Sequence, residues 1–292
     1  MVTDRRIIVS NNRHAIDLSG QPYYVVSTEG FDTLDIQVVT SQGYGQVGAT
    51  VVNSCILPRD MTINGQIYAE TTDRMQDLKE NLINLFLPTE KVTINHFYGG
   101  RNRIITAVVE KSPAFSFTKV TRILEYKVQL KAADPYWRDV TESLVQIANW
   151  KGGLRFPLHI PKKGTVFAVK QPSLIAVVYN KSNMMVGMRF SFIANGSVVN
   201  PQLFNINTRE CFKLNCVMEP GEIITVQTGE DKTVTKRIKG VESDYIGKID
   251  LAGGGNRFME LYPGDNLFRY SAESGEDMLE VKICFYNKYA GV

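Results

Sequence analysis

The sequence predicts a mainly β protein with two domains. The first is expected to be a β-sandwich or barrel-like domain with one amphipathic helix, and the second an antiparallel β-sandwich. A chain of 292 residues is longer than one average domain. Short runs rich in β-branched and aromatic residues recur along it, bounded by Gly, Pro or Asn. A helical period is strong in one segment of the first half, and these observations together predict the fold class.

Short strands make up most of the first half. A tight hairpin is predicted at Tyr98–Arg101, because Gly99 and Gly100 can adopt the positive φ angles that two-residue turns require. The first-half strands are predicted at residues 36–39, 47–57, 92–98, 104–109 and 120–130.

One amphipathic helix is predicted over residues 73–86. Asp73 is the expected N-cap, with Gln76 three residues later, and Pro88 stops the helix. A single amphipathic helix among strands must lay its apolar stripe on a sheet. The stripe recurs at steps of three and four residues and consists of Met75, Leu78, Leu82, Leu85 and Phe86.

The strand that begins near Leu124 ends at a conspicuous motif, Asp134, Pro135, Tyr136 and Trp137. Apolar and polar residues alternate up to this motif, as in a half-buried strand. Proline cannot donate to a ladder and keeps the preceding residue out of helical angles, so the strand must stop here. The two aromatic residues are expected to pack on a core and lock a domain junction. We therefore predict a first domain over residues 1–140, a connection over 141–155 and a second domain over 156–292.

Many short strands, punctuated by Asn, Gly and Pro, are also predicted in the second half. The clearest lies at 278–286, where Leu279, Val281, Ile283 and Phe285 alternate with polar residues and Cys284. No helical stripe of comparable length is present in this half. Short strands at this spacing predict an antiparallel sandwich or a jelly roll.

The composition excludes several classes of function. The net charge of +3 comes from 33 basic and 30 acidic side chains that are interleaved, which is not typical of a nucleic-acid surface. No apolar run approaches the ~18–20 residues of a membrane span. The histidines His14, His96 and His159 lie far apart, in no nucleophile or metal motif. Reduced, buried thiols are predicted for Cys55, Cys211, Cys216 and Cys284, and no catalytic or metal site is expected.

Residues 43–48 match the dinucleotide-binding pattern G-x-G-x-x-G, with Glu70 at the distance of a ribose-binding acid. In that pattern the third glycine opens a helix whose N-terminus faces the pyrophosphate. Here a β-branched run, Ala49–Leu57, follows instead. We therefore predict a loop or hairpin at this place, and no cofactor.

Four segments in the same order resemble motifs of the distal tail protein family of long-tailed, siphovirus-like bacteriophages and related prophage or tail-like particles. Pro58–Gly65 is similar to an Arg-x-apolar-x-apolar-x-Gly strand ahead of the helix, and Ala133–Trp137 to the motif that ends the first domain. Gly221–Thr228 and Leu261–Asn266 resemble strand and turn signatures of the second domain. Gln227 departs from the pattern, since an acidic residue or Asn is expected there. The resemblance covers nearly the whole chain.

The resemblance implies a structural virion protein and not an enzyme. Its first domain would close a homohexameric ring around a central channel, and its second, galectin-like domain would project outward. The implied partners are other copies of the chain, the tail tube protein, the tail-tip hub or tail-associated protein and a receptor-binding protein, with DNA only passing through the channel. No membrane partner is implied. The expected location is the virion tail tip, after assembly in the cytoplasm of the bacterial host.

An alternative is a host-surface adhesin whose second domain binds carbohydrate, because galectin-like folds include lectins. The sequence lacks the His-x-Asn-x-Arg strand of a galectin-type site. It has no Trp after Trp150, and Asn200-Pro-Gln202 stands where Asn-Pro-Arg would be expected. Stacking of a sugar on Tyr or Phe stays open. Function depends on sites and not on folds, and the residues of a galectin-type site are missing. The structural role is therefore the main hypothesis and the adhesin is the alternative.

Overall fold

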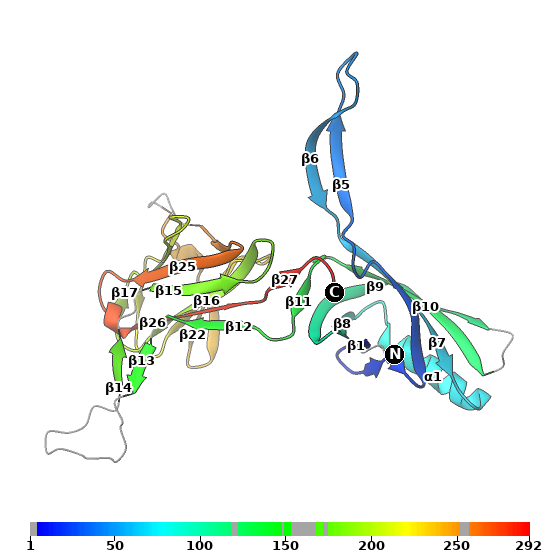
Figure 1. The fold of residues 1–292 in the computed structure, drawn as a ribbon. Coiled ribbons are helices and arrows are strands. Elements are labelled where there is room, and N and C mark those ends of the chain that lie inside the picture. Colours follow the sequence, from blue (N-terminus) through cyan, green and yellow to red (C-terminus); the bar gives the residue numbers. More distant parts are fainter. Residues whose placement is uncertain (1–4, 118–121, 148, 153–167, 172–174, 252–256) are drawn as a thin grey trace. The chain divides into compact units, whose positions relative to one another are not determined.

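A computed structural model describes residues 5–117, 122–147, 149–152, 168–171, 175–251 and 257–292 (Figure 1). The chain forms two compact units. The first contains Met1–Val140 and Lys288–Val292, and the second contains Thr141–Asn287. Each unit has its own hydrophobic core, and each is described by itself below.

The first unit is built on an antiparallel sheet that closes on itself. The sheet order begins with β2 and ends with β3, and Leu18 alone separates these two strands in sequence. Leu18 donates its N–H to the carbonyl of Ile7 on one side and accepts from Val25 N–H on the other, each at 2.9 Å. Closure in this way leaves no free edge along the path from β2 to β3, and a free edge is a common site of aggregation. In order, the strands are β2 (Ala15–Asp17), β1 (Arg6–Ser10), β8 (Lys91–Tyr98), β9 (Arg101–Phe117), β10 (Ile123–Ala132), β7 (Arg59–Tyr68), β4 (Tyr23–Glu29) and β3 (Ser19–Gly20).

The predicted helix is present as α1 (Thr72–Leu85) and packs on this sheet. Its cap differs from the prediction, because Thr71 and not Asp73 is the N-cap. Thr71 keeps an extended backbone and its side chain accepts from Arg74 N–H at 3.3 Å, so the chain turns helical two residues earlier than expected. Asp73 lies in the first helical turn. The apolar stripe is buried as predicted, at Met75, Leu78, Leu82, Leu85 and Phe86.

A long hairpin, β5 (Ile36–Ser41) and β6 (Thr50–Ile56), is inserted between β4 and β7. We call Ile36–Ile56 the arm. Every residue of β5 and β6 is exposed, and neither strand pairs with another described strand (Figure 1). Residues 43–48 lie in the turn of this hairpin, so the prediction of a loop or hairpin instead of a nucleotide-binding helix is confirmed.

The strand β10 ends at Ala132, ahead of Pro135, as the sequence predicts. After the motif, β11 (Trp137–Asp139) pairs with β9 and with β27 (Lys288–Tyr289). The predicted second domain extends to residue 292, but the last five residues belong to the first unit. The reason is this pairing, since β27 adds to the free side of β11.

The second unit contains two antiparallel sheets that share one core, a β-sandwich. Part of the predicted connection belongs to this sandwich, because β12 pairs with β26; residues 148 and 153–155 of that connection lie outside the described residues. One sheet runs β12 (Ser143–Gln146), β26 (Leu279–Phe285), β16 (Val186–Ala194), β21 (Ile223–Gln227), β22 (Thr233–Ile238) and β23 (Val241–Asp244), with β24 (Glu260–Leu261) beside β16. The other runs β15 (Ile175–Asn180), β25 (Gly264–Ser271), β18 (Gln202–Asn205) and β19 (Cys211–Lys213). Two short pairs complete it, β13 (Asn149–Gly152) with β14 (Ala168–Gln171), and β17 (Val198–Val199) with β20 (Val217–Met218).

The cysteine prediction holds only in part. All four thiols are free, but Cys216 alone is buried; Cys211 and Cys284 are half-buried and Cys55 is exposed on the arm. The β-branched neighbours of Cys55 resemble those of a core strand, but the arm has no described layer to pack against. In the part of the chain that the structure describes, no helix is long and apolar enough to cross a membrane.

Candidate functional site

The two first-domain motifs meet at one buried side chain, Arg59. Arg59 is 1% exposed and lies at the start of β7. Nε donates to the carbonyl of Pro135 at 2.6 Å, and Nη1 donates to the carbonyls of Gly30 and Phe31 at 2.7 and 2.9 Å. Nη2 donates to the carbonyl of Ala290. One side chain thus holds three segments that lie far apart in the sequence. We call Arg59, with Gly30, Phe31, Pro135, Trp137 and Ala290, the Arg59 cluster.

Carbonyl oxygens bind the cation of Arg59. Among the described contacts, no carboxylate forms a hydrogen bond with it. Burial lowers the pKa of Arg59, and the charges of Asp32 and Asp35 oppose that shift. An arginine stays protonated in proteins even so, because its ordinary pKa lies far above neutral pH. The four carbonyl dipoles therefore replace water around a permanent charge. Removing the guanidinium would take this donor away from the carbonyls of Gly30, Pro135 and Ala290, and the lost bonds cost free energy.

Trp137 forms the apolar side of the cluster. It is fully buried, and its indole N–H donates to the carbonyl of Phe31 at 3.0 Å, the same oxygen that Arg59 contacts. Its ring lies 5.4 Å from the ring of Phe31 and 6.0 Å from that of His96, measured between centroids. The expectation that Trp137 packs on a core is therefore met, and the indole also carries a specific hydrogen bond.

The other residues of the motif contact the returning C-terminal segment. Asp134 accepts from Tyr136 N–H at 3.2 Å and from Lys288 Nζ at 2.7 Å. Tyr136 is only half-buried, and Lys288 Nζ lies 5.7 Å from the centre of its ring. Pro135 supplies the carbonyl that Arg59 binds. The motif thus fastens the segment before residue 140 to the segment after residue 287, both within the first unit.

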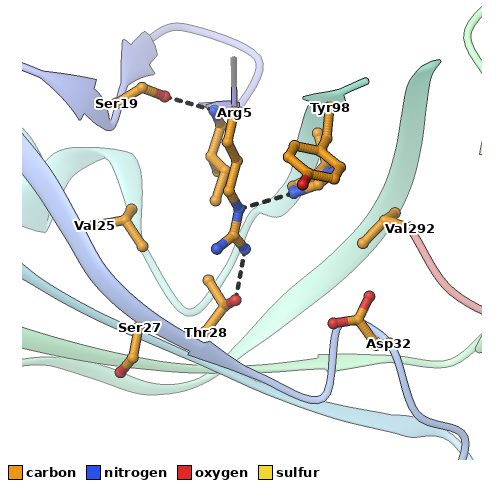
Figure 2. Close-up of a pocket in the computed structure, with 10 residues that line it drawn as sticks. Arg5, Ser19, Val25, Ser27, Thr28, Asp32, Tyr98 and Val292 are labelled. Carbon is orange, nitrogen blue, oxygen red and sulfur yellow. Dashed lines mark hydrogen bonds between the residues drawn. The ribbon is translucent and has the colours of Figure 1, made fainter. Parts of the chain in front are cut away.

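A polar cavity of about 730 Å³ borders the cluster (Figure 2). The guanidinium of Arg5 points into it; Arg5 Nε donates to His96 Nε2 at 3.0 Å and Arg5 Nη2 to Thr28 Oγ1 at 2.6 Å. Burial, and then the charge of Arg5, lower the pKa of His96 to about 4, so the imidazole is neutral at pH 7 and accepts the bond. Asp32 and Val292 also line the cavity.

Sequence reasoning did not identify Arg59, Arg5 or His96 as members of one site. A signal for His96 was present, since it follows Val92 and Ile94 at the two-residue period of the buried face of β8. Arg59 gives a weaker signal, a lone arginine at the start of an apolar alternation. Its partners are backbone carbonyls, which every residue carries, so no sequence pattern marks them.

The arm has two unlike faces. Cross-strand pairing places Ile36 opposite Ile56, and Val38 opposite Ser54. The exposed aliphatic face consists of Ile36, Val38, Val51 and Ile56. The opposite face pairs Gln37 with Cys55, Val39 with Asn53 and Ser41 with Thr50, and is mostly polar. A two-stranded hairpin is at best marginally stable in water, so this aliphatic face is suited to docking on another surface.

Comparison with known proteins shows what these features are similar to. Residues 19–132, which include the helix, the arm and most of the closed sheet, match the model of the phage tail protein RIFT-related domain. A search of curated proteins gives no match. Among solved structures, the chain is similar to SPP1 Dit (gp 19.1), described as a paradigm of the hub adsorption apparatus in phages that infect Gram-positive bacteria. The TM-score is 0.69 at 11% identity, covering 97% of this chain and 99% of that one.

Two further similar chains come from baseplates of phage P2 in the activated conformation. One structure, with Ca, has a TM-score of 0.58 at 11% identity and covers 100% of both chains. The other, with Sr, has a TM-score of 0.56 at 9% identity and covers 99% of both. Residues 19–132 therefore match a phage tail protein RIFT-related domain, and the chain as a whole has a fold similar to that of SPP1 Dit.

Proposed function

We propose that this protein is a structural hub of a phage tail, whose copies form a homohexameric ring that joins the tail tube to the tail tip or baseplate. The domain match and the similarity to Dit and baseplate chains support a structural role in the distal tail. The hexamer follows from the resemblance to the distal tail family. The chain acts by assembly and not by catalysis.

The observation that carries the proposal is the arm. Its aliphatic face is exposed, and among the described residues neither of its strands pairs with a strand outside the arm. A second copy of the chain is the occupant that covers this face. When each arm docks on the next copy, head-to-tail contacts bury every arm only if the ring closes. Ring closure therefore stabilises the arm and the assembly together.

The remaining partners follow from that ring. The tail tube protein contacts one side of the ring and the tail-tip hub the other, with DNA passing through the central channel. The second unit supports receptor-binding proteins. The protein is located at the virion tail tip after assembly in the cytoplasm of the bacterial host.

Light scattering after size exclusion, on the full chain alone and with its tube protein, tests the ring. The chain offers a matched pair of variants, because Val38 and Val39 are adjacent, 53% and 45% exposed, and on opposite faces of the arm. We expect V38D to abolish the hexamer, since it places a charge in the docked aliphatic face, and V39D to retain it. Absence of any higher-order ring in both conditions, or equal assembly of V38D and the parent chain, would contradict the proposal.

A further inference from the structure

We infer that Arg59 is a positioning residue that couples the arm to both chain connections between the two units, so that docking of the arm is transmitted to β11 and β27. The inference rests on the proposed function in one respect, namely that a second copy covers the arm. The coupling itself is a property of one chain and can be measured without a ring.

The first step is that Arg59 holds both ends of the arm. Gly30 and Phe31 begin the segment that leads into β5, and Arg59 itself follows the end of β6. The two ends are also joined directly, because Leu57 N–H donates to the carbonyl of Asp35 at 2.8 Å. Gly30 has a φ of +75° and packs so closely on Asp60 that a Cβ there would lie 2.0 Å from its carbonyl oxygen. The base of the arm therefore has little room to move without displacing Arg59.

The second step is that the same guanidinium holds both connections. The chain leaves the first unit after Val140, three residues beyond Trp137, and returns to it at Lys288. Pro135 lies just ahead of β11 and Ala290 just behind β27, and Arg59 donates to both carbonyls. The two strands pair directly, with Trp137 opposite Tyr289 and Arg138 opposite Lys288. Arg59 thus binds a carbonyl close to each of the two points where the chain passes between the units.

The third step concerns the chemistry of the guanidinium. The guanidinium is planar and rigid, so its N–H donors keep fixed directions relative to one another. If Gly30 and Phe31 shift, the guanidinium cannot move with them without weakening its bonds to Pro135 and Ala290. Because the cation is buried, lost bonds are not replaced by water, which makes partial opening costly. The charges of Asp32 and Asp35, both at the base of the arm, attract the same cation. The cluster therefore opens as one unit or stays closed.

Native-state hydrogen exchange on the full chain, at concentrations below assembly, tests the coupling. In the parent chain, amides at residues 31–36, 137–139 and 288–290 should show one common opening free energy, as members of a cooperative unit do. R59K keeps the charge but has one nitrogen, which cannot reach three segments at once. In R59K we expect the opening equilibria of the three segments to separate by about tenfold or more, as for the loss of charged hydrogen bonds.

Trp137→Phe serves as the matched control. It removes another donor to the carbonyl of Phe31 but leaves the guanidinium in place. The three segments should open more readily in W137F and still open together. Distinct opening free energies in the parent chain would overturn the inference, and that measurement decides it even if R59K does not fold. A common opening that persists in R59K would overturn it as well.

A second measurement links the coupling to assembly. On ring formation, exchange at β11 and β27 should slow in the parent chain, and should not slow in R59K rings although the arm itself becomes protected. Protection of β11 and β27 in R59K rings equal to that of the parent would contradict the transmission. If no ring forms at all, the proposed function fails, while the experiment on the unassembled chain still decides the coupling.

Discussion

The Arg59 cluster and the arm adjoin each other in the chain, yet each inverts the usual rule of burial. Arg59 is a cation with 1% exposure, whereas Val38 and Ile36 are aliphatic and more than half exposed. Side chains of these types normally occupy the opposite places. The cation is buried because four carbonyls bond to it within the same unit.

This difference shows that burial depends on available partners. The guanidinium of Arg59 has its hydrogen-bond partners inside the first unit, so these hydrogen bonds contribute to the stability of a single chain. The aliphatic face of the arm has no described partner in its own unit, so its burial is left to assembly. We therefore expect substitutions in the cluster to affect folding, and substitutions on the arm to affect association.

The largest effect is expected from Arg59→Met. Methionine fills similar space but donates no hydrogen bond, so the carbonyls of Gly30, Pro135 and Ala290 lose the donor that Arg59 supplies, which should lower the free energy of unfolding by about 3–5 kcal/mol. Denaturant titration of the unassembled chain measures this. Arg6→Met is the matched control, because Arg6 forms an exposed ion pair with Asp17 at 2.6 Å in the same unit. That change should cost less than about 1 kcal/mol. If both variants lost the same free energy of unfolding, the buried Arg59 would contribute no more to stability than the exposed Arg6.

A pH dependence of up to about 3 kcal/mol is expected from His96. Its pKa falls from 6.5 to about 4 on folding, so the native state favours the neutral ring. This contribution is fully present above pH 6.5 and is lost as the pH falls toward 4, because the unfolded chain then binds a proton that the folded chain excludes. Unfolding free energies at pH 7, 5.5 and 4 should therefore fall more steeply for the parent than for His96→Gln. Parallel profiles would show that folding does not lower the pKa of His96.

Gly65→Ala should cost about 1–3 kcal/mol through overpacking. A Cβ at Gly65 would lie 2.3 Å from the hydroxyl oxygen of Tyr126 and 2.4 Å from the carbonyl oxygen of Tyr24. Gly20→Ala is a control in the same sheet, since a Cβ there meets nothing within 4 Å. Thermal unfolding of both variants compares the sites. A stable G65A protein would mean that Tyr126 can leave its place without loss.

The smallest effect on the single chain is expected from Val38→Asp. The side chain is already more than half exposed, so the free energy of unfolding of the unassembled protein should change by less than about 0.5 kcal/mol. The same substitution should abolish the ring, which gives the sharpest contrast with Arg59→Met. Denaturation below the assembly concentration measures the first effect. A loss of several kcal/mol there would mean that the arm packs on its own chain.

Much of the local structure could be predicted from the sequence. The apolar stripe of α1, the Tyr98–Arg101 hairpin and the end of β10 before Pro135 are all present. The predicted N-cap of α1 was wrong by two residues. Thr71 and Asp73 are both residue types that cap helices, and the helix begins after the earlier of the two. The end of the second unit was also misplaced, because five residues at the chain end carry too little pattern to show which strand they join.

By itself, the sequence determined the amphipathic helix, several of the strands, the stop at Pro135 and the resemblance to distal tail proteins, because side-chain period and turn chemistry act over a few residues. Tertiary structure decided that Leu18 closes the sheet, that β27 returns to β11 and that Arg59 gathers the carbonyls of three segments. The physical reason is common to all three. Each depends on backbone hydrogen-bonding groups, which are nearly the same in every residue, so only their position in space distinguishes the partners that were chosen.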